Sequence, residues 1–147
     1  FTLITQNVDN LHERAGSTSV IHMHGELLKM HCQQSGTIYD CTEDIRVSDI
    51  CKCCGTAGNL RPHIVWFGEI PMHMDIIETL LAECTLFVSI GTSGTVYPAA
   101  GFRDAAQAHG AKTVELNLEP TSTASLFDNA NYGNALKIVP EFFKHLI

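Results

Sequence analysis

Three residues with acid–base or metal-binding side chains occur at alternate positions in one short run: His22, His24 and Glu26. On a strand, alternate side chains point to the same face, so the three could act together. One interpretation is a catalytic metal site in which Glu26 is the third ligand or the base. A second is a single working histidine, His24, followed by Gly25, which would let a cofactor or substrate approach the backbone. Hydrogen-bonded structural histidines are the third interpretation.

A second group of reactive side chains is the cysteines, of which five fall within residues 32–54. Two C-x2-C pairs about 15–20 residues apart are typical of a structural zinc site. Here the first pair has Ser35 in its second position, and serine is a poor zinc ligand. We therefore predict zinc bound by Cys32, Cys51 and Cys54, with Cys41 or Cys53 able to supply a fourth thiolate, and unligated loop thiols as the alternative.

These residues must be positioned by regular elements, and three short apolar segments predict buried strands: Phe1–Ile4, Leu86–Ile90 and Thr113–Leu116. A polar cluster follows each, at residues 5–7, 91–94 and 117–119. A helix within residues 98–110, with Pro near its start and Gly after its end, separates the last two strands. Strand, helix and strand in this order indicate a parallel sheet, in which ligands bind beyond the carboxyl ends of the strands.

Further helices are expected at about Asp9–Ala15 and Met74–Glu83, and from Pro140 to the C-terminus. The last would present Phe142, Phe143, Leu146 and Ile147 on one apolar face. The fold class predicted is α/β, with a Rossmann-like parallel sheet and flanking helices. We expect it to comprise residues 1–31 and 61–147, with a small zinc-binding insertion at residues 32–60.

Composition limits the function classes. The chain has 147 residues, 45% hydrophobic and 17% charged, with a net charge of −7, which does not fit a disordered or fibrous protein. No apolar run approaches the roughly 18 residues of a membrane span. No Lys/Arg cluster is present to bind phosphates, so neither membrane nor direct nucleic-acid binding is expected. Crowded cysteines suit a metal site in a reducing compartment, and we expect a cytoplasmic protein.

Two of the polar clusters could contact a nucleotide. Gly91–Gly94 offers backbone amides and two hydroxyl groups, and Asn117–Glu119 adds an amide and a carboxylate that could bind ribose hydroxyls. The chain has neither a G-x-G-x-x-G nor a G-x-x-x-x-G-K-[ST] run. A solvated loop is the alternative for Asn117–Glu119.

Taken in order, the motifs resemble the sirtuins, most closely the bacterial CobB-type branch. The resemblance covers the whole chain and rests on the runs TQNVD, HG, the cysteine-rich segment, RPHIVWFGE, GTSGTVYPAA and NLE, which begin at Thr5, His24, Cys32, Arg61, Gly91 and Asn117. It implies an NAD-dependent protein lysine deacylase, a deacetylase or desuccinylase, that transfers the acyl group to ADP-ribose and releases nicotinamide. Its partners would be NAD and acyl-lysine proteins or peptides.

The resemblance also assigns roles to residues. His24 would be the general base that acts on a ribose hydroxyl. Gln6, Asn7, Val8 and Asp9 would line the nicotinamide and ribose pocket. The adenosine half of NAD would contact Gly91, Thr92, Ser93, Asn117, Leu118, Glu119 and Ala135.

The run His63–Gly68 is expected to bind the substrate peptide, which could add itself as a strand to an exposed backbone edge. Val65, Phe67 and Gly68 would be the substrate-binding residues, with Val65 and Phe67 flanking the acyl-lysine. Core packing is the alternative for Trp66.

The chain begins at Phe1, and the glycine-rich cofactor loop and acyl-selectivity residues of the family are expected upstream of it. We therefore expect a fragment that is poorly active alone, within a full-length parent that is active. Two alternatives from other classes remain: a metal-dependent hydrolase using His22, His24 and Glu26, and a non-catalytic zinc-bearing interaction module.

Overall fold

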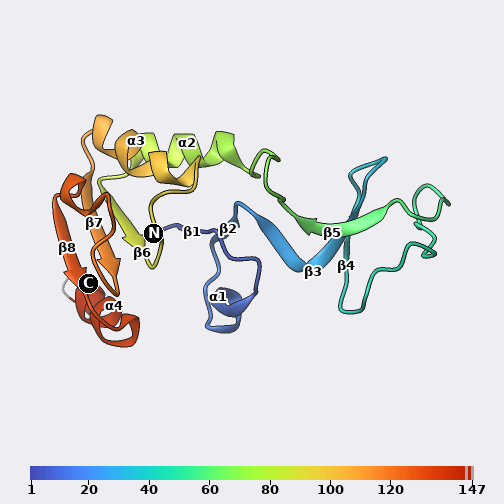
Figure 1. Cartoon of the computed structure of the whole chain (residues 1–147), viewed down its shortest axis with the longest axis horizontal. Helices are drawn as coiled ribbons and strands as arrows, with labels where there is room; N and C mark the ends of the chain where they lie inside the picture. Colours follow the sequence, from blue (N-terminus) through green and yellow to red (C-terminus); the bar gives the residue numbers. More distant parts are fainter. Residues whose placement is uncertain (145, 147) are drawn as a thin grey trace. The chain divides into compact units, whose positions relative to one another are not determined.

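The computed structural model describes residues 1–144 and residue 146. The chain consists of two compact units, residues 1–74 and the residues from Asp75 onward, and each is described by itself (Figure 1). The grouping of residues 1–31 with 61–147 around an insertion stays a prediction. Ile147, expected on an apolar helix face, lies outside the described residues. Within the described part, no helix is long and apolar enough to cross a membrane.

The first unit begins with two parallel strands, β1 (Leu3–Thr5) and β2 (Val20–His22), paired from Leu3↔Val20 to Thr5↔His22. The short helix α1 (Leu11–Arg14) lies between them in sequence. The Asp9 carboxylate accepts a hydrogen bond from the Leu11 amide at 3.0 Å. The helix expected at Asp9–Ala15 is thus present but shorter, because Asp9 is used to satisfy its first turn.

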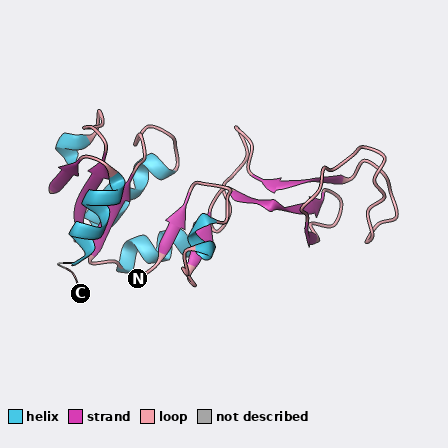
Figure 2. Cartoon of the chain, turned by 90° about the horizontal axis from the view of Figure 1, so that it is seen from below, coloured by secondary structure: helices cyan, strands magenta, loops and turns pink. Residues whose placement is uncertain are grey.

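An antiparallel sheet follows, with strand order β4-β3-β5 (Figure 2). Its strands are β3 (Gly25–Cys32), β4 (Ile38–Asp40) and β5 (Leu60–Ile64). The pairing of β3 with β5 shifts register between Glu26 and Met30, which is a β-bulge. Strand β3 therefore runs from Gly25, directly after His24, to Cys32.

The second unit is a Rossmann-like α/β arrangement with a parallel sheet of order β6-β7-β8. The strands are β6 (Leu86–Ile90), β7 (Lys112–Asn117) and β8 (Asn129–Tyr132). Helix α2 (Met74–Glu83) precedes β6 as predicted, and a 3-10 turn, η1 (Ala99–Gly101), leads into α3 (Phe102–Ala108), which contacts β6 and β7. A second 3-10 turn, η2 (Ala124–Leu126), precedes β8. Buried side chains of this unit include Ile77, Leu81, Phe102, Ala106, Val114 and Leu116.

The last helix, α4, spans Ala135–Lys144, so the expectation that it starts at Pro140 is wrong. The side chain of Asn134 accepts a hydrogen bond from the Leu136 amide at 2.9 Å, which starts the helix five residues earlier than Pro140. Pro140 lies inside the helix instead of opening it. Proline is common at the first position of a helix, and for that reason the prediction placed the helix start at Pro140.

Candidate functional site

His24 lies in a turn and not on a strand. Strand β2 ends at His22 and β3 begins at Gly25, so the expectation that His22, His24 and Glu26 share one strand face is wrong. Gly25 has φ of +81°, which turns the chain between the two strands. His24 is therefore presented at a chain reversal, where it is partly exposed.

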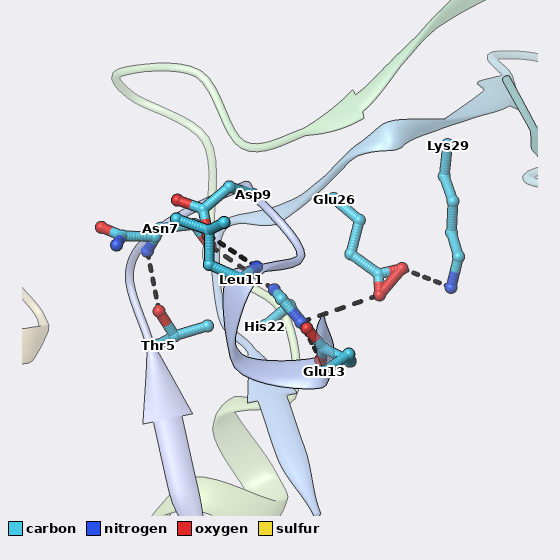
Figure 3. A network of polar contacts seen from close by, with 8 residues as sticks. All are labelled: Thr5, Asn7, Asp9, Leu11, Glu13, His22, Glu26 and Lys29. Carbon is cyan, nitrogen blue, oxygen red and sulfur yellow. Dashed lines mark hydrogen bonds and ion pairs between the residues drawn. The ribbon is translucent and has the colours of Figure 1, made fainter. Parts of the chain in front are cut away.

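The loop of residues 5–8 is held against the segment of residues 22–27 by its main chain. Four consecutive carbonyls of this loop accept hydrogen bonds from that one segment. The contacts are Thr5 O with Met23 N (3.1 Å), Gln6 O with His24 Nδ1 (3.0 Å), Asn7 O with His22 Nδ1 (3.4 Å) and Val8 O with Leu27 N (2.8 Å). The side chain of Asn7 points away from His22 (Figure 3) and is exposed. The histidine and the loop thus form one hydrogen-bonded unit.

The contact with Gln6 fixes which nitrogen of His24 can act as a base. A carbonyl oxygen can only accept a hydrogen bond, so Nδ1 of His24 must carry the proton that it donates to Gln6. In the neutral ring, Nε2 then holds the lone pair. His24 is therefore arranged as a proton acceptor through Nε2.

Gly25 serves a different purpose from the one expected. A Cβ atom at this position would lie 2.1 Å from the carbonyl oxygen of His63 on β5. The His24 carbonyl also accepts a hydrogen bond from Val65 N at 2.9 Å. The close approach that requires glycine is thus made by the protein's own β5 backbone, and it fixes the turn that carries His24.

Four cysteines meet at the far end of β3. The Sγ atoms of Cys32, Cys51, Cys53 and Cys54 all lie within 4.8 Å of one another, the only group of three or more potential ligands found within residues 1–144 and 146. At a Zn–S distance of about 2.3 Å, the edge of a tetrahedral site is about 3.8 Å. The Cys32–Cys54 Sγ distance is 3.8 Å, so the cluster could hold zinc.

Cys53 is the fourth thiol, a choice that spacing left open. Cys41 is not in the cluster, because its thiol donates to the Glu43 carbonyl at 3.1 Å. A hydrogen bond with Ser35 lowers the pKa of Cys53 to about 6, and one from Asn59 lowers the pKa of Cys54 to about 7. Thiolates are the ligand form, so both shifts favour metal binding at neutral pH.

The run expected to bind substrate lies mostly beyond the sheet. Strand β5 ends at Ile64, Val65 follows without regular structure, and Phe67 and Gly68 lie in a turn. Phe67 is fully exposed. Trp66 is 55% exposed with the Arg61 guanidinium 5.8 Å from its ring centroid, so its core-packing interpretation is wrong.

A charged pair that the sequence analysis missed closes this turn. Arg61 donates to both carboxylate oxygens of Glu69, at 2.6 and 3.1 Å, and Glu69 also accepts from the Trp66 amide at 2.9 Å. These contacts hold the pKa of Glu69 down at about 2, with the Arg61 hydrogen bond as the main cause. The opposite charges of Arg61 and Glu69, at the two ends of the RPHIVWFGE run, could have indicated this pair.

The second unit has a cavity of about 440 Å³ at the carboxyl ends of β6 and β7. Among the predicted cofactor residues, Gly91, Asn117, Leu118 and Ala135 line it. Thr92, Ser93 and Glu119 do not, although Asn117 Nδ2 donates to the Thr92 carbonyl at 2.9 Å. Gly133, Asn134 and Leu136 also line the cavity and were missed. The polar cluster after β8, which resembles those after β6 and β7, could have identified them.

Comparisons with known proteins all point to one family. The Sir2 family profile matches residues 1–98. The NAD-dependent protein deacylase of Yersinia pestis is 59% identical over 145 residues, covering 99% of this chain and 52% of the relative. The enzyme of the same name from Escherichia coli K12 is 56% identical over 147 residues, covering 100% of this chain and 53% of the relative. The chain spans about half the length of these curated relatives.

Solved structures agree. A Sir2 homologue in complex with NAD superposes with a TM-score of 0.88 at 34% identity, covering 99% of this chain and 57% of that one. Sir2Af2 bound to a myristoylated histone peptide superposes with a TM-score of 0.80 at 33% identity, covering 97% and 63%. The chain therefore belongs to the Sir2 family.

Proposed function

We propose that this chain is part of an NAD-dependent protein lysine deacylase that transfers the acyl group to ADP-ribose and releases nicotinamide. The observation that carries the proposal is the position of His24, whose Nε2 is left as a base beside the loop of residues 5–8. Membership of the Sir2 family and the names of the relatives at 56–59% identity support it.

The residues present suit NAD. In the first unit, Asn7 and Asp9 offer polar side chains in and directly after the loop whose Gln6 carbonyl holds His24, and Val8 completes the loop. In the second unit, a cavity at strand ends is lined by a glycine backbone, an asparagine amide and apolar side chains, which suits a nucleoside. We assign Gly91, Thr92, Ser93, Asn117, Leu118, Glu119 and Ala135 to that half.

When bound, NAD would supply the ribose carbon that the acyl oxygen of the modified lysine attacks as nicotinamide leaves, and the ribose hydroxyl that finally carries the acyl group. The chain's own contribution is a proton acceptor. His24 Nε2 takes the proton of a ribose hydroxyl, while the Gln6 carbonyl keeps Nδ1 protonated and the ring oriented. The resulting imidazolium retains the Gln6 hydrogen bond, so no reorientation of the ring is required.

The substrate class proposed is acyl-lysine in a protein or peptide. Exposed apolar groups in the turn closed by Arg61 and Glu69, notably Phe67, suit contact with an acyl-lysine chain, and the Val65 carbonyl and the Gly68 backbone could pair with a peptide strand. The histone peptide bound to Sir2Af2 is a precedent from that protein. Acetyl and succinyl groups are both proposed as acyl groups.

We also propose a cytoplasmic location, because six free thiols suit a reducing compartment. Zinc at the cysteine cluster would be structural, since a site closed by four thiolates leaves no open position for chemistry.

The test uses the full-length parent and an acetyl-lysine peptide. We expect one nicotinamide released for each lysine deacylated, and no turnover without NAD. Deacylation without NAD that stops on brief chelation would instead favour a metal hydrolase. Peptide binding without turnover would favour an interaction module.

A second comparison sets the parent against the 147-residue chain alone. We expect the isolated chain to be poorly active or inactive, because it spans about half of its active relatives. Turnover of the isolated chain at the rate of the parent would contradict this.

A further inference from the structure

His22 is a buried histidine, 8% exposed, with hydrogen-bonding partners on both ring nitrogens (Figure 3). Its Nε2 lies 2.8 Å from a carboxylate oxygen of Glu13 on helix α1. Its Nδ1 lies 3.4 Å from the carbonyl of Asn7 in the loop of residues 5–8. The imidazole therefore links α1 to the loop that carries the proposed cofactor residues.

Both partners of this ring are acceptors. A carboxylate and a carbonyl have no proton to give, so a neutral imidazole could donate to only one of them and would direct a lone pair at the other. The doubly protonated ring satisfies both contacts. His24 differs in this respect, because only its Nδ1 faces such an acceptor in the described contacts within residues 1–144 and 146.

Charged side chains surround the His22 ring. Glu13 makes the direct contact, and a carboxylate oxygen of Glu26 on β3 lies 4.0 Å from the same Nε2. Lys29 forms an ion pair with Glu26. Two carboxylates thus face His22, one of them shared with an ammonium group. The hydrogen bond from His22 lowers the pKa of Glu13, which keeps that carboxylate charged.

We propose that His22 is a positioning residue for NAD binding: held by Glu13 through Nε2, its ring fixes the Asn7 carbonyl through Nδ1 and thereby the orientation of the Asn7 side chain. This inference rests on the proposed function. It concerns ground-state placement of the cofactor loop and assigns His22 no contact with reacting atoms. Loss of His22 should therefore raise the KM for NAD much more than it lowers kcat.

The first test needs no catalysis. Nitrogen-15 NMR of the histidine rings of the parent should show a proton on Nδ1 of His22, the donor to the Asn7 carbonyl. In the Glu13→Gln variant, which lacks the carboxylate on Nε2, the Nδ1 contact with Asn7 should weaken. A wild-type His22 ring without a proton on Nδ1 would overturn the proposal, whether or not the protein is a deacylase.

The second test is kinetic. His22→Leu removes the ring that holds the Asn7 carbonyl, so it should raise the KM for NAD about tenfold or more. His22→Asn places an amide donor near the position of Nδ1 and should restore the KM to within about threefold of wild type. The matched control is His109→Leu, because Nδ1 of His109 also lies on a backbone carbonyl, that of Ala105, at 2.9 Å.

The outcomes separate positioning from folding. If His22→Leu lowers the folded fraction but the folded protein binds NAD with an unchanged KM, His22 is structural only and the proposal is wrong. Equal KM values for His22→Leu and His22→Asn would also overturn it. A wild-type parent without NAD-dependent turnover would overturn the proposed function instead; NAD affinity by calorimetry would then replace KM in the same comparison.

Discussion

At the residue scale, two histidines separated by one residue have different hydrogen-bonding environments. His24 has Nδ1 on the Gln6 carbonyl, and His22 has acceptors at both ring nitrogens. The run of alternate polar residues did not indicate this difference. It depends on Gln6, Asn7 and Glu13, which the fold brings to the segment from earlier in the chain.

His24→Ala should abolish NAD-dependent deacylation by the parent. General-base catalysis contributes roughly 10²–10⁴-fold in rate, and no other group is assigned to this role. The measurement is nicotinamide release with saturating peptide, and His109→Leu serves as the control for histidine loss. Turnover of the alanine variant within a few-fold of wild type would exclude His24 as the base.

Gly25→Ala should be strongly destabilising. The added Cβ would meet the His63 carbonyl at 2.1 Å, and the backbone has φ of +81°, so steric overlap adds to conformational strain. We expect a loss of at least about 2 kcal/mol in the free energy of unfolding by urea.

The control for that variant is Gly36→Ala, where φ is +72° but no atom lies within 4 Å of the added Cβ. It should cost only about 1–2 kcal/mol, the strain of a left-handed residue. Equal losses for the two variants would mean that the approach of β5 does not require glycine at position 25.

At the element scale, strand β5 and the turn after it are set by contacts that sequence periodicity does not contain. Strand β6 and helix α2 were predictable, because an apolar run and an amphipathic pattern determine them locally. The end of β5 at Ile64 was not, since Arg61 and Glu69 close the turn through side chains eight positions apart. The start of α4 at Ala135 was missed for a similar reason: its cap is a single side chain, that of Asn134.

The Arg61–Glu69 pair predicts an acid transition of this turn. The pKa of Glu69 is lowered from 4.5 to about 2 in the folded chain. A lowered carboxyl pKa stabilises the fold above the unfolded value, and that stabilisation is lost as the pH falls from about 4.5 through about 2. Trp66 is the only tryptophan, so its fluorescence should change in this range.

Glu69→Gln should remove that fluorescence transition, because the amide does not titrate. Other carboxyl groups of the chain stay in place in this variant and control for general acid effects. A wild-type fluorescence midpoint at the ordinary glutamate value would show that Arg61 does not hold the carboxylate in solution.

At the scale of the whole molecule, the chain consists of two units with different sources of stability. The second unit has a parallel sheet with buried apolar residues such as Val114 and Leu116. In the first unit, the two fully buried cysteines, Cys32 and Cys51, belong to the cluster. Spacing predicted three of its members; Cys53 could not be separated from Cys41, because the choice depends on how the chain folds beyond β4.

The zinc content of two variants should show which of Cys53 and Cys41 is a ligand. We expect about one zinc per chain, strongly reduced in Cys53→Ser and retained in Cys41→Ser, measured by metal analysis after native purification. Zinc retained fully by the Cys53 variant would show that three thiolates suffice.

Strong chelation should unfold residues 32–60 while hydrogen exchange in β6, β7 and β8 stays slow, because the two units form separate cores. Simultaneous loss of protection in both units would show that they unfold as one.

The four carbonyls of residues 5–8 have a consequence for sequence variation. Since its four carbonyl acceptors belong to the main chain, substitutions at positions 7 and 8 leave these hydrogen bonds in place. The side chains at positions 7 and 8 can therefore be exchanged without loss of the acceptors, whereas positions 22 and 24 must keep a side-chain donor. The loop is therefore a suitable place to redesign ligand preference by substitution without rebuilding the fold.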